Sequence, residues 1–127
     1  DPSAALLSHL PSGVEARRGD LLRIPAADAE FDAALAVESL EHALVPAQAV
    51  AQLCRVVRPG GHVLIIDKNR RHQALSEHEP WERWFRPREL ADWLAPFCEE
   101  VRVEPVAHGE GRPPDLFIVA AGRRKSD

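Results

Sequence analysis

The sequence lacks the features that mark secreted and membrane proteins. It contains only two cysteines, Cys54 and Cys98. Two are too few for a disulfide framework, so we expect both to be free thiols in a reducing compartment. No apolar run is long enough to cross a membrane, and the chain does not start with a signal peptide. These absences favour a cytoplasmic protein that does not use a membrane as a partner.

Methionine is absent as well, and so is any excess of positive charge. With 16 Lys and Arg against 20 Asp and Glu, the formal charge is −4. This gives no electrostatic footprint for nucleic acid, although a local basic patch on an acidic protein can still bind RNA. The lack of any methionine suggests that the 127 residues are a piece of a longer protein. A chain of this length forms one domain with a real core, and its composition does not predict an oligomeric state.

What the sequence does contain is a strand–helix–strand pattern. Residues 33–37 are an apolar run that is too short for a buried helix, so we expect a buried strand. Pro46 can open a helix, because the N–H that proline lacks has no partner in the first turn, and the Pro-Gly-Gly at residues 59–61 ends it. Residues 62–66 are continuously apolar, as strands buried on both faces are. A strand, a crossover helix and a second strand predict two parallel strands. The apolar face of the helix would consist of Val50, Leu53, Val56 and Val57.

Two motifs within this pattern resemble those of a known protein family. The first is F-D-x-x-x-x-x-E-x-L-E-H at residues 31–42, and the second is R-V-V-R-P-G-G-H-V-L-I-I-D at residues 55–67. Together they resemble the class I S-adenosylmethionine-dependent methyltransferases of types 11 and 12. The resemblance implies an α/β, Rossmann-like sheet that is mostly parallel, with an antiparallel C-terminal edge hairpin. It also implies that residues 1–127 are a partial domain, truncated at the N-terminus, from the end of the second strand to the last strand.

The glycine-rich turn of this family has no counterpart in the sequence. The family carries G-x-G-x-G after its first strand, where glycine allows the backbone to approach the cofactor closely. No such motif occurs here, so the resemblance places the turn upstream of Asp1. Two interpretations stay open: a longer protein supplies the turn, or the protein is a degenerate member that does not bind the cofactor.

The resemblance assigns contacts with S-adenosylmethionine to five residues. Asp1 stands where the family has an acid that accepts hydrogen bonds from the ribose hydroxyls. Asp20 and Leu21, within G-D-x-x-x-I-P, would bind the adenine amino group and pack on the ring. Val37 and Glu38 would lie near the methionine end. The ordinary alternatives are that a terminal aspartate is solvated and that an aspartate after a strand makes a turn.

Glu38, Glu41 and His42 form a second candidate group. On a helix, positions i, i+3 and i+4 share one face, here at the carboxyl end of a strand, where open α/β sheets bind ligands. In the family, E-x-x-E-H occurs in ubiquinone-biosynthesis O-methyltransferases, which act on catechol-like rings. It also occurs in small-RNA 2′-O-methyltransferases, where it holds a divalent cation. Three interpretations stay open: a Mg²⁺ or Mn²⁺ site, His42 as a general base, or a polar loop tip with Glu38 on the amino group of the cofactor.

About twenty residues between the second strand and the next helix show no clear periodicity, and loops of that length are often lids or binding segments. We expect one helical turn with Trp81, Trp84 and Phe85 on the same face, either as a packed cover or as a substrate wall. His72 and His78 are candidate later metal ligands or ordinary surface histidines. The histidine-rich pattern of the small-RNA enzymes is not met here, which weighs against RNA as the substrate.

The C-terminal third has a regular pattern. Pro87 opens a predicted helix over residues 87–94. The alternation of residues 101–106 predicts a half-buried strand, and the apolar residues 116–121 predict the last strand. The resemblance implies that these two strands form the antiparallel hairpin at the edge of the sheet.

These patterns lead to one expected function and two alternatives. We expect methyl transfer from S-adenosylmethionine to oxygen or nitrogen of a small molecule, with His42 contacting or deprotonating the acceptor. The first alternative is a non-catalytic, methyltransferase-like module for binding or dimerisation. The second is a metal-assisted O-methyltransferase that acts on an RNA 2′-hydroxyl, with Glu38, Glu41 and His42 as the ligands.

Overall fold

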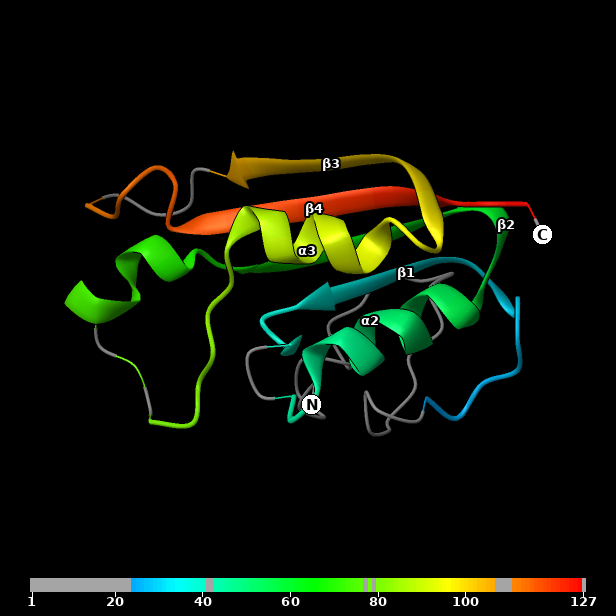
Figure 1. The fold of residues 1–127 in the computed structure, drawn as a ribbon, viewed down its shortest axis with the longest axis horizontal. Coiled ribbons are helices and arrows are strands. Elements are labelled where there is room, and N and C mark those ends of the chain that lie inside the picture. Colours follow the sequence, from blue (N-terminus) through cyan, green and yellow to red (C-terminus); the bar gives the residue numbers. More distant parts are fainter. Residues whose placement is uncertain (1–23, 41–42, 77, 79, 107–110, 127) are drawn as a thin grey trace.

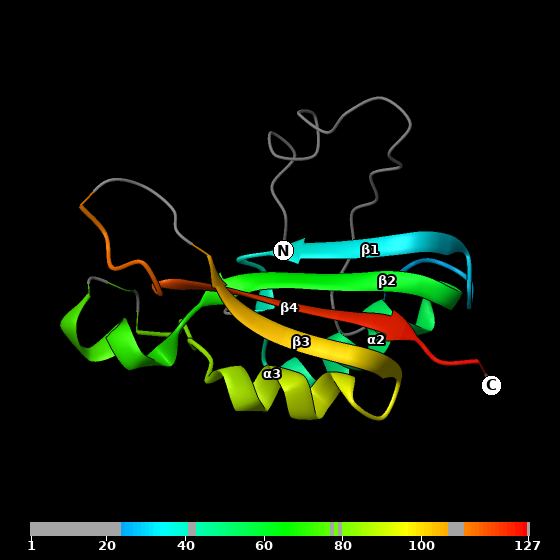
Figure 2. The same ribbon diagram turned by 90° about the horizontal axis from the view of Figure 1, so that it is seen from above.

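The structure is a computed structural model that describes residues 24–126, except 41–42, 77, 79 and 107–110. Its four strands form one sheet in the order β1-β2-β4-β3 (Figure 1). Helices α2 and α3 lie on the same face of this sheet (Figure 2). No helix within the described ranges is long and apolar enough to cross a membrane. The elements in chain order are β1 (Phe31–Val37), α2 (Pro46–Arg55), β2 (Val57–Lys68), the 3-10 helix η2 (Arg70–Leu75), α3 (Pro87–Leu94), β3 (Cys98–Val106) and β4 (Phe117–Arg124).

The strand–helix–strand pattern predicted from the sequence is present. Strands β1 and β2 are parallel neighbours, and Val37 lies opposite Ile66. Helix α2 begins at Pro46, as predicted. The predicted end of the helix at residues 59–61 is wrong: α2 ends at Arg55, and β2 begins at Val57, which pairs with Phe31 before a shift in register. The parallel pairing, on which the assignment of the cofactor site depends, is therefore confirmed.

The C-terminal strands confirm the expected hairpin and correct one detail of the sheet. Strands β3 and β4 are antiparallel, and β4 also pairs antiparallel with β2, so it lies between them. One of the three described pairings is parallel and two are antiparallel. The described sheet is therefore mixed and mostly antiparallel, where a mostly parallel sheet was predicted. The reason is that the described residues contain one crossover unit, whereas β4 runs against both of its neighbours.

The core lies between the sheet and the two helices. It contains the buried face of α2, the inward side chains of β2 and β4, and the apolar face of α3. Cys54 on α2 and Cys98 at the start of β3 are both buried free thiols, as expected, with their Sγ atoms 3.9 Å apart. The hydrogen bond with Cys98, and then burial, raise the pKa of the Cys54 thiol. This thiol therefore stays protonated in the core.

The segment between β2 and α3 differs from its prediction. No helical turn forms at residues 81–85; instead Phe85 makes a parallel bridge with Asn69. Trp84 and Phe85 are buried, whereas Trp81 is 67% exposed, so the three aromatic side chains do not share a face. The ring of Phe85 meets Trp93 of α3 edge to face at 5.8 Å. The extended bridge is favoured because it buries two large aromatic side chains. An isolated helical turn at residues 81–85 would instead fix several residues in exchange for a single hydrogen bond.

Candidate functional site at the carboxyl ends of β1 and β2

The parallel strands β1 and β2 end together, and the chain turns sharply at Glu38. The Glu38 N–H donates to the carbonyl of Ile66 at 2.7 Å, which holds this residue against the end of β2. Glu38 has φ +50°, a left-handed conformation that side chains other than glycine rarely adopt. The Ser39 hydroxyl donates to the carbonyl of Val37 at 3.1 Å, and Ser39 is buried. The backbone is therefore fixed where open α/β sheets bind ligands.

Charged side chains from β1, β2 and the following loop meet at this edge. The Lys68 ammonium lies 3.2 Å from a carboxylate oxygen of Glu38 and 3.6 Å from one of Glu82. It also lies 5.1 Å from the centre of the Trp84 ring, whose indole N–H donates to Glu82 at 3.4 Å. The side chain of Glu82 is 10% exposed and that of Lys68 is 20% exposed, but that of Glu38 is 42% exposed. Glu38 is thus the member of the group that a ligand can reach.

A second polar cluster fixes the segment that follows Lys68. A ring nitrogen of His72 lies 2.7 Å from a carboxylate oxygen of Asp115, and Arg71 lies 3.2 Å from the other. The Asn69 side chain donates to the carbonyl of Asp115 at 3.2 Å. The hydrogen bond with His72 lowers the pKa of the Asp115 carboxyl. This cluster connects η2 to the loop before β4 and so fixes the segment that follows β2, beside the Glu38 edge.

The structure brings together only part of the predicted site. Val37 and Glu38 lie at the end of β1 as predicted, with Val37 38% exposed. The other predicted residues lie outside the described residues: Asp1, Asp20, Leu21, Glu41 and His42. Their proposed roles therefore stay predictions.

The predicted later ligands His72 and His78 have other partners. His72 pairs with Asp115, and His78 lies beside the carbonyl of Ser76 and the Trp84 ring. Within the described ranges, no three His, Cys, Asp or Glu side chains gather as a metal site would require. Glu38, the described member of the predicted metal group, faces the Lys68 ammonium instead.

Sequence reasoning missed three of the residues that build this edge. Lys68, Glu82 and Asp115 were not singled out from the sequence. The position of Lys68 directly after the apolar run of β2 was a usable signal, because the residue that ends a parallel strand faces the ligand edge. The pairing of Glu82 with Lys68 was not predictable, since it depends on the fold of the intervening loop.

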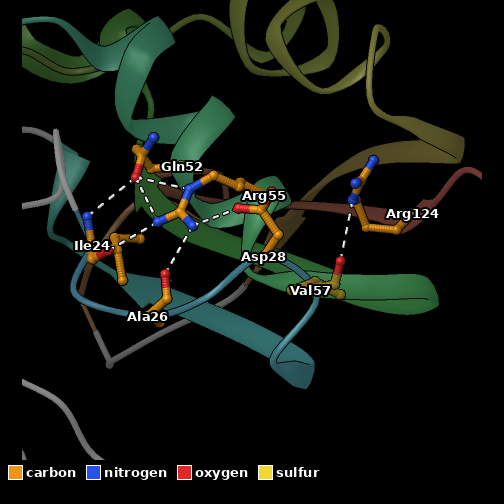
Figure 3. Close-up of polar contacts among 7 residues, drawn as sticks. All are labelled: Ile24, Ala26, Asp28, Gln52, Arg55, Val57 and Arg124. Carbon is orange, nitrogen blue, oxygen red and sulfur yellow. Dashed lines mark hydrogen bonds and ion pairs between the residues drawn. The ribbon is translucent and has the colours of Figure 1, made fainter. Parts of the chain in front are cut away.

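Arg55 at the end of α2 is a further residue that sequence reasoning did not single out (Figure 3). Its guanidinium donates to the carbonyls of Ile24 at 2.9 Å and Ala26 at 2.8 Å, and it pairs with Asp28 at 2.8 Å. The Gln52 side chain accepts from the same guanidinium and from the Ile24 N–H. Arg55 therefore anchors the segment that follows the predicted adenine-binding pair at residues 20–21.

Replacing Arg55 with alanine should lower the free energy of unfolding by about 2 kcal/mol, because several charge-assisted hydrogen bonds to a loop are lost together. Urea unfolding followed by circular dichroism measures this. Arg58→Ala is the matched control, since Arg58 makes an exposed pair with Asp32 at 2.7 Å and such pairs contribute less than about 1 kcal/mol. Equal effects of the two substitutions would contradict the anchoring role.

Comparison with known proteins decides the family. The family described as "Methyltransferase domain" matches residues 1–65, half of the chain. The chain belongs to this methyltransferase family. It is 32% identical over 111 residues to a ubiquinone biosynthesis O-methyltransferase of Hahella chejuensis, covering 72% of this chain and 46% of that protein. It is also 32% identical over 96 residues to a 2-phytyl-1,4-naphtoquinone methyltransferase of Synechocystis, covering 76% of this chain and 37% of that protein. The chain thus spans half or less of the length of these relatives.

Solved structures show the same fold. A methyltransferase of Thermotoga maritima, described as a possible histamine N-methyltransferase, superposes with a TM-score of 0.71 at 23% identity, covering 89% of this chain and 65% of that one. An N-methyltransferase of Bradyrhizobium japonicum in complex with S-adenosyl-L-homocysteine superposes with a TM-score of 0.64 at 18% identity, covering 85% and 53%. The predicted Rossmann-like methyltransferase fold is therefore confirmed.

Proposed function

We propose that the protein containing this chain transfers the methyl group of S-adenosylmethionine to oxygen or nitrogen of a small molecule. The observation that carries the proposal is the position of Glu38. In a member of the methyltransferase family, an accessible carboxylate stands at the end of β1, beside its parallel neighbour β2. The donor carries an ammonium and a sulfonium, and a carboxylate at this edge suits both positive charges.

The residues of the chain would position the reactants. Glu38 holds the amino group at the methionine end, and Val37 packs beside it. The predicted contacts of Asp1, Asp20 and Leu21 hold the adenosine. When bound, S-adenosylmethionine supplies a methyl carbon that accepts the lone pair of the acceptor as its bond to sulfur breaks, which leaves S-adenosylhomocysteine. His42 takes the proton of the acceptor, so the chain contributes mainly alignment and proton removal.

The acceptor proposed is a small ring compound with a hydroxyl or amine. One relative is named for ubiquinone biosynthesis and the other for a phytyl-naphtoquinone, and quinone precursors present ring hydroxyls. The ring of Trp84 is buried beside the Lys68 ammonium, so it packs in the core and does not face an acceptor. The exposed Trp81 lies on the same loop and is available to cover a flat ring.

Calorimetric titration of the complete protein with S-adenosylhomocysteine tests the donor half of this proposal. We expect binding with one ligand per chain. Transfer of a labelled methyl group to a panel of catechols and aryl amines then tests the acceptor half. A complete protein that binds no S-adenosylhomocysteine would contradict the proposal and favour a non-catalytic, methyltransferase-like module.

A divalent cation is not part of this proposal, and we expect a strong chelator to leave the methyl transfer rate unchanged. The physical reason is that the Lys68 ammonium lies 3.2 Å from Glu38 and already supplies the positive charge there. A divalent cation bound to the same carboxylate would carry twice the charge of the donor's ammonium, so it would meet a correspondingly larger repulsion from Lys68. The rate is measured with and without chelator at the same ionic strength. Loss of activity that added Mg²⁺ or Mn²⁺ restores would instead establish the metal group of Glu38, Glu41 and His42.

A further inference from the structure

A hollow of about 610 Å³ lies between the end of β2 and the start of α3, and arginine dominates its lining. Neither Glu38 nor Lys68 lines this feature, and it has no role in the proposed reaction. It is notable because the chain as a whole is acidic, with a formal charge of −4. The lining residues are Asn69, Arg70, Arg71, Arg86, Pro87 and Arg88. We call this feature the arginine hollow.

The backbone brings the arginines together. Asn69 and Phe85 form a parallel bridge. The Arg70 N–H donates to the carbonyl of Phe85 at 2.8 Å, and the Phe85 N–H donates to the carbonyl of Lys68 at 3.0 Å. The residues that follow on each side of this bridge, Arg70 and Arg86, are therefore held close to each other. Backbone hydrogen bonds therefore fix the two positions from which these exposed side chains extend.

Charge compensation around the hollow is incomplete. Arg71 pairs with Asp115 at 3.2 Å, and Arg88 makes an exposed pair with Asp92 at 3.5 Å. The described residues show no ion pair of a carboxylate with the guanidinium of Arg70 or Arg86, while the Glu89 carboxylate accepts from the Arg86 backbone N–H at 3.0 Å. No acidic residue lines the hollow. Guanidinium groups gathered in this way repel one another, and an anion placed among them removes that repulsion.

We propose that the arginine hollow binds a phosphoryl group. Guanidinium presents a planar pair of N–H donors that matches two oxygens of a phosphate, and this makes arginine the side chain of choice for phosphate recognition. Several guanidinium groups suit a doubly charged oxyanion better than a single carboxylate. The source of the group is either a soluble phosphorylated compound or the headgroup of an anionic lipid. The proposal does not depend on the methyltransferase function, because Lys68 and Glu38 are not part of the hollow.

Binding to the complete protein tests the proposal, with pyrophosphate as the soluble probe and phosphatidylglycerol vesicles as the lipid probe. Calorimetry measures the first and vesicle co-sedimentation the second, with phosphatidylcholine vesicles as the blank. We expect the wild-type protein to bind at least one probe, and R70A/R86A to bind that probe at least tenfold more weakly. Binding of pyrophosphate alone identifies a soluble ligand, and binding of phosphatidylglycerol alone identifies a lipid headgroup.

The matched control is R102A/K125A, which removes two exposed positive charges from β3 and the C-terminal end and should bind as the wild type does. If R70A/R86A does not fold, R70Q/R86Q keeps a polar side chain without the charge and is used in its place. Wild-type protein that binds neither probe overturns the proposal. So does equal weakening of binding in the hollow variant and in the control, since that outcome means net charge alone is responsible.

Discussion

Replacing Gly61 with alanine is expected to lower the free energy of unfolding by about 3 kcal/mol or more, the largest effect that we expect for a single methyl group in this chain. A Cβ atom at Gly61 would lie 2.4 Å from the carbonyl oxygen of Asp32 and 2.6 Å from a methyl carbon of Val57. The first contact is with backbone of β1, so no side chain can rotate away to relieve it. Overpacking of this kind forces shifts of backbone, and here it would separate β1 from β2.

Urea unfolding of Gly61→Ala beside Gly111→Ala measures this effect. Gly111 has φ +76°, and a Cβ atom there meets nothing within 4 Å. Its substitution therefore carries only the conformational cost of a left-handed residue, about 1 to 2 kcal/mol. A Gly61→Ala protein as stable as the wild type would show that the parallel pair is not packed as described.

Replacing Glu38 with lysine in the complete protein is expected to weaken the binding of S-adenosylhomocysteine about a hundredfold. The change removes a charge-assisted hydrogen bond to the amino group of the ligand, which is worth about 1.5 to 3 kcal/mol. It also places a second ammonium where Lys68 now lies 3.2 Å from the carboxylate. Calorimetric titration measures the dissociation constant. Glutamate and lysine have the same backbone preference at φ +50°, so the fold should be kept.

Two further variants show whether the effect of Glu38→Lys is specific to this position. Glu104→Lys changes the net charge by the same amount on an exposed position of β3, and it should leave the dissociation constant unchanged. Glu38→Gln removes the charge while keeping the shape, and it should give an intermediate affinity. If Glu38→Lys binds within threefold of the wild type, Glu38 does not hold the ligand and the proposed donor site is wrong.

The order of the central elements was predictable because it depends on local signals. Pro46 fixes where α2 begins, but the helix ends at Arg55, before the Pro-Gly-Gly at residues 59–61, which lies inside β2. A parallel pair then follows from chain connectivity, since two strands joined through a helix on one face run in the same direction. The position of Glu38 at the ligand edge follows from this topology without any knowledge of side-chain contacts.

The segment between β2 and α3 was not predictable in the same way. Its structure depends on the bridge between Asn69 and Phe85 and on the burial of Trp84 beside Leu116 and Phe117. These partners are distant in the sequence, so periodicity carries no signal of their contact. The same holds for the pair of Lys68 and Glu82. Local spacing suggested a helical turn here, and tertiary packing determined the extended conformation instead.

The most direct measurement of the central claim is an amide NMR titration of the isotopically labelled complete protein with S-adenosylhomocysteine. The claim is that the ligand binds across the carboxyl ends of the parallel strands β1 and β2. We expect the amides of Val37, Glu38 and Ser39 to show the largest shifts in the part of the chain that the structure describes. Shifts confined to the β3–β4 hairpin, with these three amides unchanged at saturating ligand, would contradict the claim.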